Sequence, residues 1–139
     1  MADVGSRRLG LFYSRHGNIA LPAEKLIQVL EQPRLYGGPF LPAYVIGLVR
    51  FQTEILPVLQ CGNQAPGSVV EPFYVTVCGS SLGLVGFGCD QVRQIADWES
   101  GRYEELTEPD YCGAVGRFFH QTETYTVIDV DLLVECLPE

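Results

Sequence analysis

Short apolar segments, separated by turns rich in Gly and Pro, run through almost the whole chain and limit the folds open to it. The 139 residues include 15 Gly and 9 Pro, which interrupt the apolar sequence every few residues. Many short segments at this close spacing are typical of a β-barrel or a β-sandwich. We therefore predict an all-β (mainly β) fold with strands near residues 9–14, 19–21, 44–49, 53–59, 73–78, 82–87, 90–95, 111–119 and 124–130.

Two segments have the pattern of a helix. Pro22 suits a first helical position, and Leu26, Val29 and Leu30 follow at helical spacing, so we expect a short helix over residues 22–32. We expect a final helical turn at residues 131–136 and an acidic connection at residues 96–109. The length fits one domain, which we place at residues 9–136 after a flexible N-terminal arm at residues 1–8.

The charge balance bears on the partners of the chain. Nine Lys and Arg residues against 17 Asp and Glu residues give a formal net charge of −8. Nucleic acid and anionic membranes require a cationic face, so we expect neither nucleic-acid binding nor direct membrane insertion, and an electropositive protein is the better match. The chain has no apolar stretch of the ~18 residues that a membrane span needs, and the run at 9–13 is too short for a signal-peptide core. We expect a cytoplasmic protein.

The cysteine, histidine and glycine patterns favour neither a metal nor a cofactor. The cysteines contain no C-x-x-C pair, and we expect most of them to be buried apolar side chains in a reducing compartment: Cys61, Cys78, Cys89, Cys112 and Cys136. His16 and His120 lie far apart in sequence without a third ligand nearby. The G-x-x-G-x-G run at 83–88 reverses the dinucleotide-binding order and precedes no helix. We therefore predict no metal site and no cofactor.

One motif keeps an enzymatic alternative open. Residues 79–83 read GSSLG, a literal G-x-S-x-G, and His120 follows in the order of a serine hydrolase, with Asp90 or Asp110 between them. In hydrolases this motif joins a strand to a helix, whereas residues 84–88 continue as LVGFG, which favours a second strand. We therefore interpret the motif as a hairpin turn and keep a small hydrolase built on Ser81 and His120 as the less favoured alternative.

Four phrases, in the right order, resemble those of the CheW-like family of bacterial chemotaxis adaptors. The first is the IALP segment at 19–22 with the apolar positions after it, and the most specific is PAYVIGLVRFQTEILPV at 42–58. The others are GFGCDQV at 86–92 and the closing pair YCGAV at 111–115 and YTVIDVDLL at 125–133. The resemblance covers nearly the whole chain and implies two small five-stranded SH3-like barrels packed on a shared core, with one or two short helices.

The resemblance also implies a function without catalytic residues. Family members bridge the cytoplasmic tips of chemoreceptors to the regulatory domain of a CheA-type histidine kinase in a two-component system. The expected partner-binding residues of this chain are Gln28, Val49, Phe51, Gln52 and Leu56. For Val49 and Leu56, ordinary core packing is an equally good interpretation.

The chain departs from the family pattern at two of these positions. Gln52 and Thr53 stand where members usually have Arg and Gly, and Gln28 stands where an acidic residue is frequent. In the family those positions can form a charge pair near the receptor-binding groove, whereas two amides keep hydrogen bonding without the charge-assisted contribution. This leaves open a scaffold of another signalling or pilus-motility assembly, or a decoy that competes with a standard adaptor.

Overall fold

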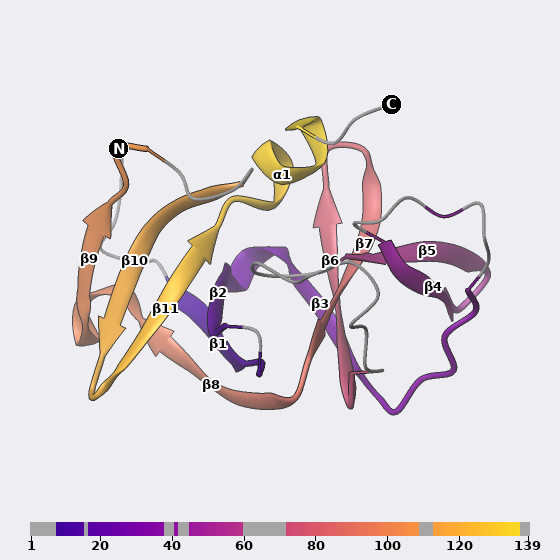
Figure 1. Cartoon of the computed structure of the whole chain (residues 1–139), viewed down its shortest axis with the longest axis horizontal. Helices are drawn as coiled ribbons and strands as arrows, with labels where there is room; N and C mark the ends of the chain where they lie inside the picture. Colours follow the sequence, from indigo (N-terminus) through magenta and orange to yellow (C-terminus); the bar gives the residue numbers. More distant parts are fainter. Residues whose placement is uncertain are drawn as a thin grey trace.

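The computed structural model describes residues 8–15, 17–37, 41, 45–59, 72–108 and 113–136 (Figure 1). These residues form eleven strands, two short 3₁₀ helices and one α-helix, which confirms the all-β expectation. In chain order the elements are β1 Arg8–Tyr13, β2 Ile19–Pro22, η1 Ala23–Lys25, β3 Leu26–Glu31, β4 Val45–Phe51, β5 Glu54–Leu59, β6 Tyr74–Ser80, β7 Gly83–Cys89, β8 Gln91–Asp97, η2 Trp98–Ser100, β9 Arg102–Glu105, β10 Ala114–His120, β11 Glu123–Ile128 and α1 Val130–Cys136.

The strands form two sheets, and each sheet curls so that its two ends meet. The first has six strands in the order β8-β1-β2-β11-β10-β9, and its end strands β8 and β9 are consecutive in the chain, joined by η2. The second has five strands in the order β3-β6-β7-β5-β4. The segment after β3 closes this sheet, because Tyr36 and Leu48 of β4 exchange two backbone hydrogen bonds of 2.8 and 2.7 Å. Two barrel-like halves result, one with a strand more than expected.

The two sheets share one apolar core. Phe12 and Leu21 of the first sheet pack in the same buried cluster as Leu59 and Phe87 of the second. Val130 of α1 joins this cluster, and Figure 1 shows α1 lying across the top of the junction between the two halves. A separate cluster fills each half: one includes Leu11 and Phe118, and the other includes Val58, Val75 and Val77. Burial of this kind is the main stabilising contribution in a chain of this size.

The predicted helix over residues 22–32 is wrong. Only residues Ala23–Lys25 form a 3₁₀ helix, and Leu26–Glu31 form the antiparallel partner of β6. Leu26 and Leu30 are partly buried against the core, but they lie on a strand whose β-branched residues Ile27 and Val29 are exposed. The helical spacing of Leu26, Val29 and Leu30 over so short a run does not determine the element, and pairing with β6 makes it a strand.

Two further expectations need a correction or a limit. The acidic connection predicted over residues 96–109 contains the end of β8, η2 and β9, whose residues 102–105 pair with β10. The predicted arm at residues 1–8 lies outside the described residues except for Arg8, which begins β1. The final helical turn is confirmed as α1, at the N-terminus of which Asp129 accepts a 3.1 Å hydrogen bond from the Leu132 N–H. No helix within the described residues is long and apolar enough to span a membrane.

Candidate protein-interaction surfaces

Three of the predicted partner-binding residues lie in the core of the five-stranded sheet. Val49 and Leu56 face each other across β4 and β5 and are each 2% exposed, and Phe51 is 7% exposed. All three belong to the cluster that also contains Val58, Val75 and Val77. For Val49 and Leu56, this position agrees with ordinary core packing, the second interpretation that the sequence left open. The burial of Phe51 makes core packing an interpretation for this residue as well.

The two predicted amide positions are both exposed. Gln52 lies in the turn between β4 and β5 with a φ of 57°, and its backbone oxygen accepts a 3.3 Å hydrogen bond from Arg50 Nε. Gln28 lies on β3 opposite Val77. Strands β3 and β4 stand at the two ends of the strand order, and within the described part of the chain no hydrogen bond joins Gln28 to Gln52. Each amide is therefore available to a partner separately.

The outward side of the β4–β5 hairpin is an apolar surface that the sequence analysis did not select. Ile55 is 71% exposed and lies opposite Arg50, and Leu48 lies opposite Pro57 on the same side. Tyr36 is 51% exposed and extends this side beyond Leu48. We call these five residues the hairpin face. In the sequence, the side chains of residues 54–59 alternate between the two faces of a predicted strand. This alternation does not say which of the two sets points inward.

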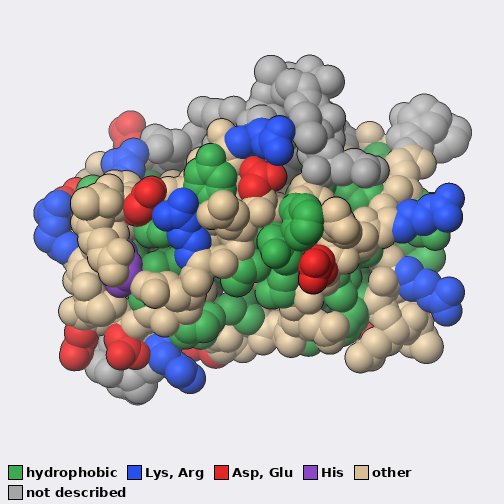
Figure 2. All heavy atoms as spheres, turned by 90° about the horizontal axis from the view of Figure 1, so that it is seen from below, with side chains coloured by type: hydrophobic (Ala, Val, Ile, Leu, Met, Phe, Trp, Pro, Cys, Tyr) green, Lys and Arg blue, Asp and Glu red, His purple; other side chains and the backbone are tan. Residues whose placement is uncertain are grey.

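Basic side chains border the hairpin face in a protein with a net charge of −8. The Arg34 guanidinium lies over the Tyr36 ring, 5.1 Å from its centroid. Figure 2 shows Lys and Arg side chains at the end of the molecule that carries β4 and β5. This face therefore presents apolar, aromatic and Arg side chains together, and aromatic residues and Arg are enriched in protein–protein interfaces.

A second apolar surface lies on the other sheet, along β8. This end strand exposes five residues in succession, Gln91 to Ile95, among which Val92 and Ile95 are apolar. Phe73 is also exposed, and it shares with Val92 a shallow depression of about 290 Å³. We call Phe73, Val92 and Ile95 the β8 surface. Figure 2, which views the molecule from this side, shows apolar side chains gathered over the middle of the face.

Ser81 and His120, the two residues of the hydrolase alternative, have different neighbours in the structure. Ser81 lies in the tight turn between β6 and β7, its N–H donates to Asp131 Oδ1 at 2.7 Å, and its hydroxyl lies 3.4 Å from Glu135 Oε2. His120 ends β10, where its Nε2 lies 3.3 Å from Gln94 Nε2 and its ring stacks on Phe118. The strand-to-strand context of the serine agrees with the predicted hairpin turn. Asp110 lies outside the described residues.

Among the described residues, we find neither a thiol with a lowered pKa nor a cluster of metal-ligating side chains. Burial raises the pKa of the Cys78 thiol to about 12 and that of Cys89 to about 11, so both are neutral thiols at physiological pH. No group of three or more His, Cys, Asp or Glu side chains in the described ranges could hold a metal ion. His16, Cys61, Cys112 and the Cys136 side chain lie outside those ranges.

Comparison with known proteins identifies the fold. No family model matches the chain. No curated protein is similar enough to count as a match. Among solved structures, the scaffolding protein TtCheW from Thermoanaerobacter tengcongensis is similar, with a TM-score of 0.73 over 96% of this chain and 96% of that one, at 15% sequence identity. The chain therefore has a CheW-like fold, as the four sequence phrases predicted.

Proposed function

We propose that this protein is a non-catalytic adaptor that couples the cytoplasmic tip of a chemoreceptor-like protein to the regulatory domain of a CheA-type histidine kinase. A solved structure of the same fold is that of a scaffolding protein, and the four sequence phrases resemble those of the adaptor family. We place the protein in the cytoplasm, in chemotaxis or a related motility pathway. The two partners follow from the family resemblance.

The observation that carries the proposal is the pair of separate apolar surfaces on the two sheets. An adaptor has to bind two partners at once, and this requires two surfaces that do not overlap. The hairpin face belongs to the five-stranded sheet, and the strand that carries most of the β8 surface belongs to the six-stranded sheet. The hairpin face combines apolar side chains with Arg50, whereas the depression between Phe73 and Val92 is bordered by Asp90, which forms an ion pair with Arg15. Surfaces that differ in this way favour different partners.

The test measures the binding of each purified partner to variants of each surface. Ile55→Ser is expected to weaken one partner about tenfold and to leave the other unchanged, and Val92→Ser is expected to do the reverse, because truncating a central apolar contact commonly costs this much. Leu82→Ser is the matched control, since Leu82 is 74% exposed but lies in the turn between β6 and β7, on neither surface. Wild-type binding by both surface variants would contradict the assignment of these surfaces.

A second candidate keeps the fold and changes the assembly. Gln28 and Gln52 are exposed neutral amides where the family often carries opposite charges, and this favours a scaffold of another signalling or pilus-motility assembly. If so, the natural protein does not bind a CheA-type kinase or a chemoreceptor, and Gln28→Glu combined with Gln52→Arg gains that binding. Binding by the natural protein contradicts this candidate. A serine-reactive probe that labels the natural protein but not Ser81→Ala would favour the hydrolase instead.

A further inference from the structure

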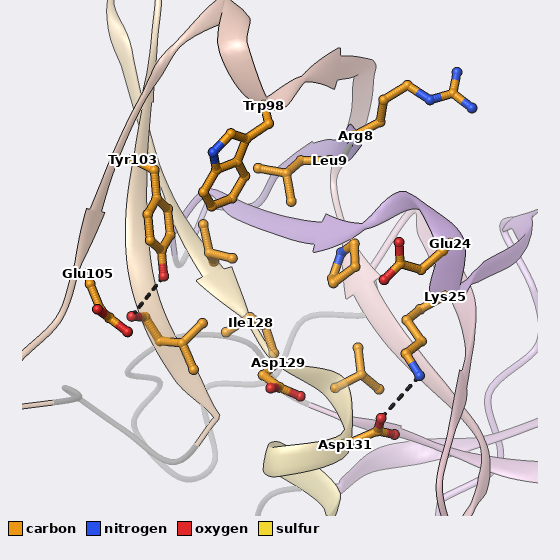
Figure 3. Close-up of a pocket in the computed structure, with 14 residues that line it drawn as sticks. Arg8, Leu9, Glu24, Lys25, Trp98, Tyr103, Glu105, Ile128, Asp129 and Asp131 are labelled. Carbon is orange, nitrogen blue, oxygen red and sulfur yellow. Dashed lines mark hydrogen bonds and ion pairs between the residues drawn. The ribbon is translucent and has the colours of Figure 1, made fainter. Parts of the chain in front are cut away.

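A pocket of about 390 Å³ opens on the six-stranded sheet (Figure 3), and none of its lining residues belongs to the hairpin face or the β8 surface. Residues of η1, η2, β9 and the start of α1 line it, together with parts of β1, β10 and β11. Its size falls within the range of small-molecule sites, which are mostly apolar with a few well-placed polar groups. The proposed adaptor function makes no use of it.

Two aromatic side chains form one wall, and their positions are fixed by the surrounding structure. The Trp98 and Tyr103 rings lie 4.4 Å apart between centroids, and Trp98 also stacks on buried Phe118. The Tyr103 hydroxyl donates a 3.1 Å hydrogen bond to the Val115 carbonyl. The Tyr103 ring covers Gly116, where any Cβ would overlap it. Both rings are therefore held in place by contacts within this half of the molecule.

The charges around this wall are predominantly negative. Lys25 is neutralised by an ion pair with Asp131, with 3.0 Å between Lys25 Nζ and Asp131 Oδ2. This leaves Glu24, Glu105 and Asp129 against Arg8, and in Figure 3 the Arg8 side chain extends away from the aromatic wall. Among the described residues, none of these three carboxylates has an ion-pair partner. Asp129 Oδ1 accepts a hydrogen bond from the Leu132 N–H, and its other oxygen, Oδ2, could accept a hydrogen bond from a ligand.

We infer that this pocket binds an organic cation with an apolar body, a primary ammonium or a guanidinium. The apolar body would stack on the wall formed by Trp98 and Tyr103, while the cationic head would lie beside Glu105 and Asp129. Aromatic faces attract cations, and unpaired carboxylates add charge-assisted hydrogen bonds to the same group. A small free amine and a Lys or Arg side chain of another protein share this chemistry.

The test uses Trp98 fluorescence, because Trp98 is the one tryptophan in the sequence and forms part of the wall. The probes share a phenylethyl body: phenethylammonium, neutral 2-phenylethanol and anionic 3-phenylpropionate. Phenethylammonium is expected to change the emission saturably at the lowest concentration, and the anion is expected to bind weakest. Equal binding of the alcohol and the ammonium, tighter binding of the anion, or no saturable change with any probe would overturn the inference.

Variants test which carboxylates recognise the charge. Glu105→Gln combined with Asp129→Asn is expected to weaken phenethylammonium roughly fivefold or more while leaving 2-phenylethanol unchanged. Asn is also a good N-cap residue, so Asp129→Asn preserves the start of α1. Glu54→Gln is the control because Glu54 is exposed on the other sheet. Equal weakening of the alcohol and the ammonium by the double variant would contradict a charge-specific site.

A third set of titrations separates the two sources of such a cation. A capped Gly-Arg-Gly peptide presents the guanidinium on a protein backbone, and butylguanidinium presents it on a free alkyl chain with the same single charge. Tighter binding of the peptide assigns the pocket to a basic side chain of a partner, and tighter binding of butylguanidinium assigns it to a small free molecule. Both results support the pocket as a cation site, and binding of neither would overturn the guanidinium part of the inference.

Discussion

At the scale of single residues, Phe51 is the position where a core role and an interface role lead to opposite results. Its side chain packs with Val49 and Leu56 and is 7% exposed. We expect Phe51→Ala to lower the free energy of unfolding by about 3–5 kcal/mol, because the cavity loses both burial and packing. Urea denaturation followed by circular dichroism measures this loss. Ile55→Ala, on the same hairpin but 71% exposed, is the matched control and should change stability by less than about 0.5 kcal/mol. Lost partner binding by Phe51→Ala at unchanged stability would instead restore the interface role.

At the scale of elements, the Asp131 carboxylate joins α1 to η1 and to the β6–β7 turn, beside the apolar packing of Val130 and Val134 in the core. Asp131 accepts hydrogen bonds from Lys25 Nζ at 3.0 Å and from the Ser81 N–H at 2.7 Å. These bonds, the Lys25 bond first, lower the pKa of Asp131 below its ordinary value of 3.8. The contribution of Asp131 to stability is therefore complete at pH values above the unfolded-state pKa and is lost as the pH falls through the lower pKa of the folded state.

Acid titration of the unfolding transition tests this attachment. We expect Asp131→Asn to be less stable than the natural protein at pH 6. We expect the difference to shrink as the pH falls below about 4, where the carboxylate becomes protonated first in the unfolded state and, at lower pH, in the folded state. Thermal unfolding between pH 6 and pH 3 gives the comparison, with Asp97→Asn as a control at an exposed residue outside these hydrogen bonds. A difference that stays constant over this range would show that the carboxylate charge does not hold α1.

The same scale shows how far the sequence predicts this fold. The hairpins and the all-β class follow from local signals, namely short apolar segments and turn residues. Leu26, Val29 and Leu30 satisfy a helical spacing, yet the segment forms a strand because β6 offers it a partner that is distant in sequence. The alternation of β5 was visible, but whether Leu56 or Ile55 points inward depends on the packing of β6 and β7. Three of the predicted partner-binding residues, Val49, Phe51 and Leu56, are therefore buried, whereas Ile55 on the same hairpin is exposed.

At the scale of the whole molecule, the shared core decides whether the two halves unfold together. Leu21 of the first sheet and Phe87 of the second are both fully buried in the cluster that joins the sheets. We therefore expect a single cooperative transition, as in most domains of this length, which is also what the predicted single domain at residues 9–136 requires. Trp98 fluorescence follows the six-stranded sheet, and hydrogen exchange of the β6 amides follows the five-stranded sheet.

A substitution in only one half tests whether the two halves unfold together. Val77 packs only in the cluster of the five-stranded sheet, and Val77→Ala removes about 2 kcal/mol of burial there. If the shared core couples the halves, this variant lowers the free energy of unfolding followed by Trp98 fluorescence by the same amount as the free energy of opening measured from β6 amide exchange. This equality is expected although Trp98 lies in the other half. A Trp98 midpoint that stays at its natural value while β6 exchange accelerates would mean two independent halves. An adaptor built of independent halves would hold its two partners in no fixed relative orientation, so coupled unfolding bears directly on whether this fold can fix the geometry of an assembly.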